Sequence, residues 1–283
     1  MSESFARVLG DAERAVAAFG RAALAQIVRT EGSTPGKPGW KLLQLTDGTR
    51  HGNLGGGAFE ALVAADAAAL LGEDSPGVDT PEPLLKRYYF TEAAVRGEPT
   101  GMVCGGLAEV LLEVLEAPPI LLVCGGGPVG QAVARAGAVA GFEPLVADDR
   151  DHFLRPELFP LGTRLARVSR AHDEDFLSPV GERLLYAAVV TRCWETDTAA
   201  LAAILRQAPR RLRYLGLMGS RRKVARVRAE LAGRGFGAAL DELHAPIGLP
   251  IGGSSPGEIA ISIVAELVAV RHRAALGSAV AHA

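Results

Sequence analysis

Short apolar runs alternate with helix-like stretches in the second half of the chain. The run 120–124, Ile-Leu-Leu-Val-Cys, has no charged or strongly polar side chain, which is typical of a strand buried on both faces. An alanine-rich stretch over 128–140 is expected to form a helix that packs back on this strand. Further strands are expected at 163–168, 184–191 and 213–217. Strands that alternate with helices predict a parallel sheet in an α/β domain.

The first half of the chain has a different pattern. Apolar residues at helical spacing predict an amphipathic helix over 3–19. The other expected elements are a helix over 58–71 and strands over 22–29, 41–45, 84–90 and 108–115. We therefore expect an N-terminal α+β domain.

A natural joint lies at Ala117-Pro118-Pro119, because consecutive prolines stiffen a linker. The predicted division is an N-terminal domain over 1–117, a C-terminal domain over 118–275 and a tail over 276–283. Each domain is long enough to bury a core of its own.

Composition narrows the class of protein. The chain has 283 residues and a formal net charge of −2, which gives no electrostatic reason to expect nucleic acid or an anionic membrane as a partner. The first residues lack the apolar core of a signal peptide, and every apolar run is too short to span a membrane. The three cysteines are odd in number and far apart, which argues against a disulfide framework and a structural zinc site. We expect a cytoplasmic protein.

A glycine-rich turn follows the buried strand 120–124. Gly125, Gly127 and Gly130 match the spacing G-x-G-x-x-G, in which the glycines allow a tight turn, close approach to a pyrophosphate and close helix–strand packing. Asp148 and Asp149 end the next strand, where a carboxylate would accept ribose hydroxyls. The C-terminal domain is therefore predicted to be Rossmann-like, a doubly wound parallel sheet. The alternative is that the Rossmann unit is only a scaffold.

Two other stretches are candidate anion sites. Gly55, Gly56 and Gly57 open a helix and could bind an anion or a cofactor, although a tight strand-to-helix connection would need the same glycines. The second stretch is Gly219-Ser220-Arg221-Arg222-Lys223, which places cations in the first turn of a helix, where the macrodipole disfavours them. A bound phosphate would explain this placement, and a solvated basic face is the alternative.

Single candidates for chemistry are two thiols and one imidazole. Cys104 lies among glycines, so its thiolate is a candidate ligand or sulfur nucleophile, with an inert buried thiol as the alternative. Cys193 follows a predicted strand together with Arg192 and Asp197, which are candidate ligand contacts; Asp197 is alternatively a helix cap. His244 lies beside a predicted strand end, where a structural role is the alternative.

Several motifs, in their order along the chain, resemble those of the XdhC/CoxI family, the xanthine dehydrogenase accessory proteins. The stretches that carry the resemblance are Arg29–Pro35, Gly55–Gly57, Gly101–Gly106, Cys124–Gly130, Asp148–Arg150, Leu217–Lys223, His244–Gly252 and Ser255–Glu266. The resemblance implies a maturation factor that binds molybdenum cofactor (molybdopterin), protects it during sulfuration and helps to insert it into a molybdenum hydroxylase. It also implies a homodimer, a cysteine desulfurase as a further partner, and a role in cofactor binding for Glu60.

Two departures from the family pattern concern the chemistry. Ala58 replaces the cysteine that usually follows the first glycine loop, and Arg192 and Trp194 replace two histidines. Cys104 is then the best remaining thiol, with Cys193 as a substitute. Two other functions stay open: an oxidoreductase that uses NAD(P) in the Rossmann domain, and a scaffold that only binds a partner protein. Against the oxidoreductase, the sequence offers no paired acid and base.

Overall fold

The computed structural model describes residues 5–72, 82–90, 98–99, 105–172, 175–178, 181, 183–209 and 211–272. The chain divides into two compact units, Met1–Ala117 and Pro118–Ala283. Each unit is built on its own six-stranded sheet. None of the described helices is long and apolar enough to cross a membrane.

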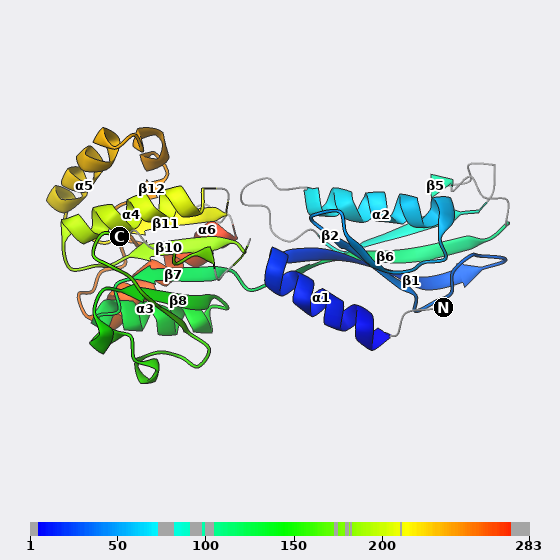
Figure 1. The fold of residues 1–283 in the computed structure, drawn as a ribbon, viewed down its shortest axis with the longest axis horizontal. Helices are drawn as coiled ribbons and strands as arrows, with labels where there is room; N and C mark the ends of the chain where they lie inside the picture. Colours follow the sequence, from blue (N-terminus) through cyan, green and yellow to red (C-terminus); the bar gives the residue numbers. More distant parts are fainter. Residues whose placement is uncertain are drawn as a thin grey trace. The chain divides into compact units, whose positions relative to one another are not determined.

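The first unit is a mixed sheet with a helix on each face (Figure 1). Its strand order is β3-β2-β1-β6-β4-β5, and every pairing is antiparallel except that of β4 with β5. The strands are β1 (Arg21–Glu31), β2 (Lys41–Leu45), β3 (Arg50–Gly52), β4 (Leu84–Tyr89), β5 (Glu98–Pro99) and β6 (Leu107–Glu116). The helices are α1 (Phe5–Phe19) and α2 (Gly57–Gly72). The α+β prediction is therefore confirmed.

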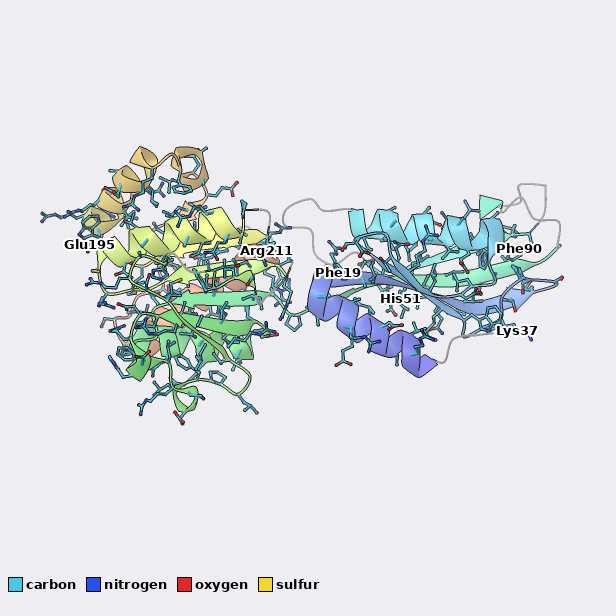
Figure 2. The ribbon with its side chains drawn as sticks, viewed as in Figure 1. Phe19, Lys37, His51, Phe90, Glu195 and Arg211 are labelled. Atoms are coloured by element: carbon cyan, nitrogen blue, oxygen red, sulfur yellow. The ribbon has the colours of Figure 1, made fainter. Side chains whose placement is uncertain are left out.

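Two separate apolar layers hold this unit together. Under α2, the Phe59 ring packs edge-on against Tyr88 and Phe90, with ring centroids 5.5 and 5.1 Å apart (Figure 2 labels Phe90). Under α1, Val8 and Ala12 pack on the other face of the sheet. Alternate residues of β1 supply both layers, because successive side chains of a strand point to opposite faces.

The second unit is a doubly wound parallel sheet of order β12-β11-β10-β7-β8-β9. Its strands are β7 (Ile120–Cys124), β8 (Glu143–Asp148), β9 (Arg164–Arg167), β10 (Leu185–Val189), β11 (Leu212–Leu217) and β12 (Leu243–His244). Helices α3 (Pro128–Val139) and α6 (Pro256–Arg271) cover one face, and α4 (Trp194–Gln207) and α5 (Arg221–Gly233) cover the other (Figure 1). Short 3-10 helices η1 (Asp151–Phe153), η2 (Pro156–Leu158) and η4 (Gly237–Leu240) lie in the connections.

The central strands are buried on both faces, as their apolar sequences predict. All five residues of β7 and all five of β10 are buried. If the strands are counted from β7, the order is 6-5-4-1-2-3, which is that of a Rossmann fold. The Rossmann-like prediction is confirmed.

Candidate functional site

The strand order changes direction between β7 and β10, and this position defines the candidate site. In open α/β sheets, ligands bind outside the carboxyl ends of the strands at such a switch point. Three loops leave the sheet at this edge: Gly125–Gly127 after β7, Asp149–Arg150 after β8 and Thr191–Cys193 after β10. We call their shared edge the carboxyl edge.

The three glycines of the loop after β7 have different surroundings. Gly125 has a φ of +115°, and a Cβ there would lie 2.8 Å from the Val190 carbonyl oxygen. A Cβ on Gly130 would overlap the Gly125 carbonyl oxygen, so α3 can approach β7 only with glycine here. A Cβ on Gly127 would meet nothing within 4 Å. Packing within the chain therefore requires Gly125 and Gly130. Gly127 faces open space, where a ligand could approach the backbone closely.

The start of α3 is open to an external acceptor. Gly127 is its N-cap and Pro128 its first residue, and the described part of the chain provides no side-chain cap there. Free N–H groups at a helix start, together with the helix dipole, favour a bound anion. Gly127 and the start of α3 thus have the donor chemistry and the space that a phosphate needs.

Asp148 is held by donors from the chain itself. Its Oδ2 accepts the Gly126 N–H at 2.7 Å and Arg150 Nη2 at 2.9 Å. Its Oδ1 accepts the backbone N–H and the Nε of Arg150, both at 2.9 Å. This buried carboxylate ties the glycine loop to the end of β8, a role different from the ribose contact expected for it.

Asp149 makes a fork-shaped ion pair across the sheet edge. Arg192 Nη1 and Nη2 donate to Asp149 Oδ1 and Oδ2, both at 2.6 Å. These hydrogen bonds lower the pKa of Asp149 to about 2, so it is ionised near neutral pH. The pair joins the loop after β8 to the loop after β10, although the two residues lie 43 positions apart.

Asp197 does not cap α4, contrary to one of the sequence alternatives. The N-cap is Cys193, and Asp197 lies in the first turn with its side chain fully buried. Its Oδ1 accepts the Thr191 hydroxyl at 2.7 Å, and its Oδ2 lies 2.6 Å from Lys223 Nζ. Burial raises the pKa of Asp197, while Lys223 and Thr191 oppose that rise.

The three cations at the start of α5 (Arg221–Gly233) point in different directions. Ser220 is the N-cap, and its Oγ accepts the Lys223 N–H at 3.3 Å. The Lys223 side chain folds across Gly219 to reach Asp197, and a Cβ on Gly219 would overlap it. Arg221 and Arg222 are exposed and pair with none of the residues that the structure describes. Two guanidinium groups are therefore available here to an anion.

The cysteines have unlike environments. Cys193 is half-buried at the start of α4, with its Sγ 3.1 Å from Thr196 Oγ1 and 3.9 Å from Arg170 Nη2. Cys124 is fully buried in β7, and burial raises the pKa of its thiol far above the ordinary value, so it is inert. Cys104 lies outside the described residues. Cys193 is thus the described thiol at the carboxyl edge.

His244 belongs to a different cluster, on β12. Its Nδ1 lies 2.9 Å from Glu266 Oε1, and its ring lies over that of Tyr214 with centroids 4.4 Å apart. Glu266 also accepts the Tyr214 hydroxyl and the Gly248 N–H. Three strand spacings separate β12 from β7, or about 14 Å. The structure therefore does not bring His244 to the glycine loop.

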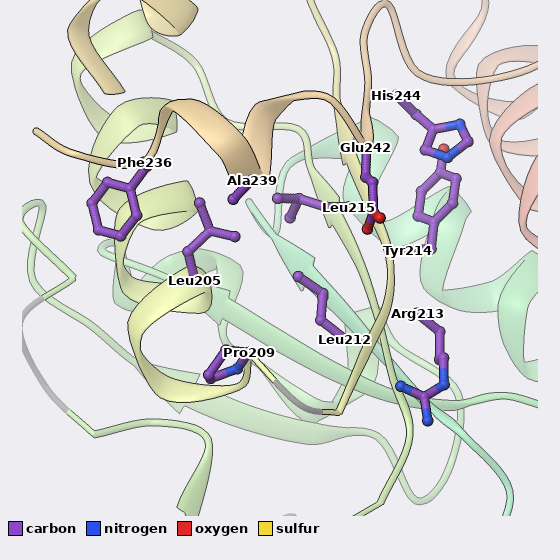
Figure 3. Close-up of a pocket in the computed structure, with 10 residues that line it drawn as sticks. All are labelled: Leu205, Pro209, Leu212, Arg213, Tyr214, Leu215, Phe236, Ala239, Glu242 and His244. Carbon is purple, nitrogen blue, oxygen red and sulfur yellow. The ribbon is translucent and has the colours of Figure 1, made fainter. Parts of the chain in front are cut away.

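A cavity of about 410 Å³ lies next to this cluster (Figure 3). Its apolar wall includes Leu205, Leu212 and Phe236, and Tyr214 and His244 line the opposite side.

Across the described residues, no three His, Cys, Asp or Glu side chains gather where they could hold a metal ion.

Three backbone amides of the glycine loop in the first unit donate to side chains of that unit. Glu60 Oε2, on α2, accepts the N–H groups of Leu54 at 2.9 Å and Gly56 at 3.2 Å. Asn53 Oδ1 accepts the Gly55 N–H at 2.5 Å. Gly55, Gly56 and Gly57 all have positive φ, between +68° and +114°. This geometry favours a tight strand-to-helix connection, which the sequence left as the alternative to an anion loop.

Three residues of these clusters have partners that the sequence did not predict. Arg150, Lys223 and Glu266 each pair with a predicted site residue or its neighbour. Arg150 directly follows Asp148 and Asp149 in the sequence, and this adjacency was the signal from which its pairing with Asp148 could have been predicted. Lys223 and Glu266 gave no such signal, because their partners lie on other elements of the fold.

Comparison with models of protein families matches the chain to one family. The model described as the XdhC Rossmann domain matches residues 121–267, and the model described as the XdhC and CoxI family matches residues 15–82. The first match alone covers more than half of the chain.

Two curated proteins are similar to the chain. It is 34% identical over 258 residues to YqeB, an uncharacterized protein of Escherichia coli, with 89% of this chain and 44% of that protein covered. It is 32% identical over 168 residues to a Bacillus subtilis protein named as a probable subunit of xanthine dehydrogenase, with 59% and 47% covered. The chain spans less than half the length of these relatives. A crystal structure of a xanthine dehydrogenase from Bacillus halodurans aligns over 95% of this chain and 97% of that one, with 21% identity and a TM-score of 0.47.

Proposed function

Because the chain belongs to the XdhC and CoxI family, we propose that it is an accessory protein of a xanthine dehydrogenase-type molybdenum hydroxylase. Its task would be to bind molybdenum cofactor and to assist its sulfuration and its insertion into the client enzyme. A relative at 32% identity is named as a probable subunit of xanthine dehydrogenase, and this similarity supports the choice of client.

The observation that carries the binding proposal is the open space at Gly127. The cofactor ends in a phosphate, and the uncapped start of α3 offers amide donors to an anion. Arg221 and Arg222, at the start of α5, provide cations without protein partners among the described residues. In this proposal the cofactor bound by the chain supplies its metal chemistry later, in the client.

The proposed help with sulfuration falls to a thiol at the carboxyl edge. Cys193 is half-buried there, whereas Cys124 is enclosed in the sheet. Cys104 remains a second candidate thiol on the family resemblance. A cysteine desulfurase would then be the donor of sulfur, and we propose it as a partner together with a second copy of the chain.

Retention of cofactor by a matched pair of glycine variants tests the binding proposal. Gly127→Ala adds a methyl group in the open space of the loop, and Gly233→Ala adds one in equally open space at the far end of α5. Free molybdenum cofactor would be added under anaerobic conditions, and its loss would be followed over time. We expect the wild type and Gly233→Ala to slow the loss of cofactor to the same extent. The slowing by Gly127→Ala should be at least tenfold smaller. Cofactor loss unchanged by the wild-type protein would refute the proposal.

A second candidate function, an oxidoreductase dependent on NAD(P), is favoured by the strand order and the glycine loop. The same purified protein would be analysed by mass spectrometry for released pterin and nucleotide. Pterin without turnover supports the accessory protein. Nucleotide together with hydride transfer, followed by absorbance, supports the oxidoreductase.

A further inference from the structure

The acid that should bind a ribose in this fold has no acceptor capacity left. A carboxylate has about four lone-pair sites. Those of Asp148 receive four N–H groups, one from Gly126 and three from Arg150, at 2.7 to 2.9 Å. The side chain is 2% exposed. A ribose diol could bind Asp148 only by displacing one of these donors, so the residues present do not fit a nucleotide held by its 2′- and 3′-hydroxyls.

The neighbouring acid is also paired with an arginine and nearly buried, although it accepts two of these hydrogen bonds and not four. Both oxygens of Asp149 accept from Arg192 at 2.6 Å, and the Asp149 side chain is 8% exposed. The two adjacent acids therefore act on their arginines and have little contact with solvent. Their negative charges are balanced by Arg150 and Arg192, one for one.

The arginines themselves still have donors to offer. A guanidinium has five N–H groups, and Arg150 and Arg192 each spend two of them on their acids. Their side chains are 28% and 36% exposed. Arg150 is also fixed by the ring of Phe153, with its Cζ 4.2 Å from the ring centroid. The edge therefore presents two guanidinium groups whose positions are set before a ligand binds.

We propose that Arg150 and Arg192 are specificity-determining residues that make the carboxyl edge accept a phosphomonoester and reject a vicinal ribose diol. A planar guanidinium matches the oxygens of a phosphate, and charge-assisted hydrogen bonds of this kind are about twice as strong as neutral ones. A diol, in contrast, needs a free acceptor, and both acids of the edge are paired with arginines and nearly buried. The inference rests on the proposed function only in that both use the glycine loop.

NADP⁺ and NAD⁺ are the probes for this selectivity, because they differ only in a phosphate at the ribose 2′-position. Calorimetric titration of the full-length protein should give at least tenfold tighter binding for NADP⁺. Equal or tighter binding of NAD⁺ would overturn the proposal, and so would the absence of binding by both probes at millimolar concentration. This comparison needs no variant, so a folding defect cannot obscure it.

Variants then assign the effect to residues. Arg150→Gln removes the guanidinium and uncovers Asp148, so we expect NADP⁺ binding to weaken and NAD⁺ binding to strengthen. Arg192→Gln should weaken NADP⁺ binding. Arg192→Lys keeps the charge but not the planar guanidinium, so its affinity for NADP⁺ should lie between those of the wild type and Arg192→Gln. Arg155→Gln is the matched control, because Arg155 is exposed in the same connection and pairs with no described residue. An Arg150→Gln variant that lost both ligands equally would contradict the assigned role.

The phosphomonoester could belong to a nucleotide or to a pterin, and competition distinguishes these sources. If NADP⁺ displaces bound molybdenum cofactor, both place a phosphate at the same arginines. If both stay bound, the arginines serve the nucleotide. A protein that retains the cofactor but prefers NAD⁺ overturns this inference alone. A protein that prefers NADP⁺ but does not retain the cofactor overturns the proposed function alone.

Discussion

Each buried carboxylate at the carboxyl edge is paired with a cation of the same chain. Asp148 has Arg150, Asp149 has Arg192 and Asp197 has Lys223. An ionised carboxylate is costly to bury, and only a well-placed cation with further hydrogen bonds offsets that cost. The Asp197 pair is the most enclosed of the three, because its carboxylate has no exposed surface. Its loss should have the largest effect on stability.

We predict that Lys223→Met destabilises the protein by about 3–5 kcal/mol, because it leaves the Asp197 carboxylate buried without its cation. The measurement is urea unfolding near neutral pH. Arg222→Met, an exposed neighbour, is the control and should change stability by about 0.5 kcal/mol at most. Adding Asp197→Asn to Lys223→Met should recover part of the loss. A Lys223→Met protein as stable as the control would contradict the structure.

The same variant should depend on pH with a definite sign. Burial already raises the pKa of Asp197 in the folded protein, and removing Lys223 raises it further. A carboxyl group with a raised folded pKa favours folding at low pH and loses that contribution as the pH rises through the folded pKa. The deficit of Lys223→Met relative to wild type should therefore shrink as the pH falls towards about 4.

Among the elements, α3 packs tightly against the end of β7. Its approach to β7 leaves no room for a side chain at Gly130, where a Cβ would overlap the backbone oxygen of Gly125. Backbone atoms cannot rotate away as a flexible side chain can. The tight packing of α3 also fixes where its uncapped start lies, so one glycine positions the proposed anion site.

We predict that Gly130→Ala lowers the free energy of unfolding by about 3 kcal/mol, at the upper end of the range for overpacked sites. Gly127→Ala, at the N-cap of the same helix and in open space, should lower it by about 1 kcal/mol at most. Both can be measured by chemical denaturation of the apo protein. The prediction fails if the two variants unfold at the same denaturant concentration.

Elements with a strong pattern could be predicted from the sequence, and weakly patterned ones could not. The run 120–124 is wholly apolar because β7 is buried on both faces, so its place was evident. The two-residue strands β5 and β12 have too few residues to show a period. The packing roles of Gly125 and Gly130 followed from their spacing. The partners of Asp149 and Asp197 did not, because Arg192 and Lys223 reach them from other strand ends.

At the scale of the whole molecule, the two units have separate cores. The clusters under α1 and α2 contain only residues of the first unit, and those around the parallel sheet contain only residues of the second. Each of the two sheets is also formed by strands of one unit alone. Folding of one unit therefore does not require side chains of the other for its core.

We predict that a fragment from Pro118 to Ala283 folds on its own. Circular dichroism should show helix and strand, and thermal unfolding should be a single cooperative transition, as for other domains of this size. Amide NMR peaks of the fragment should be well dispersed. A fragment with collapsed peak dispersion would show that the parallel-sheet unit needs more than its own core.

The hydrogen bond from the Gly126 N–H to Asp148 has a consequence for the thermodynamics of binding. Glycine loops have many accessible conformations, and fixing one at the moment of binding costs entropy. Here the buried carboxylate has already fixed the loop to β8 in the free protein. A ligand thus meets a preorganised loop, and little of its binding enthalpy is cancelled by ordering of the chain.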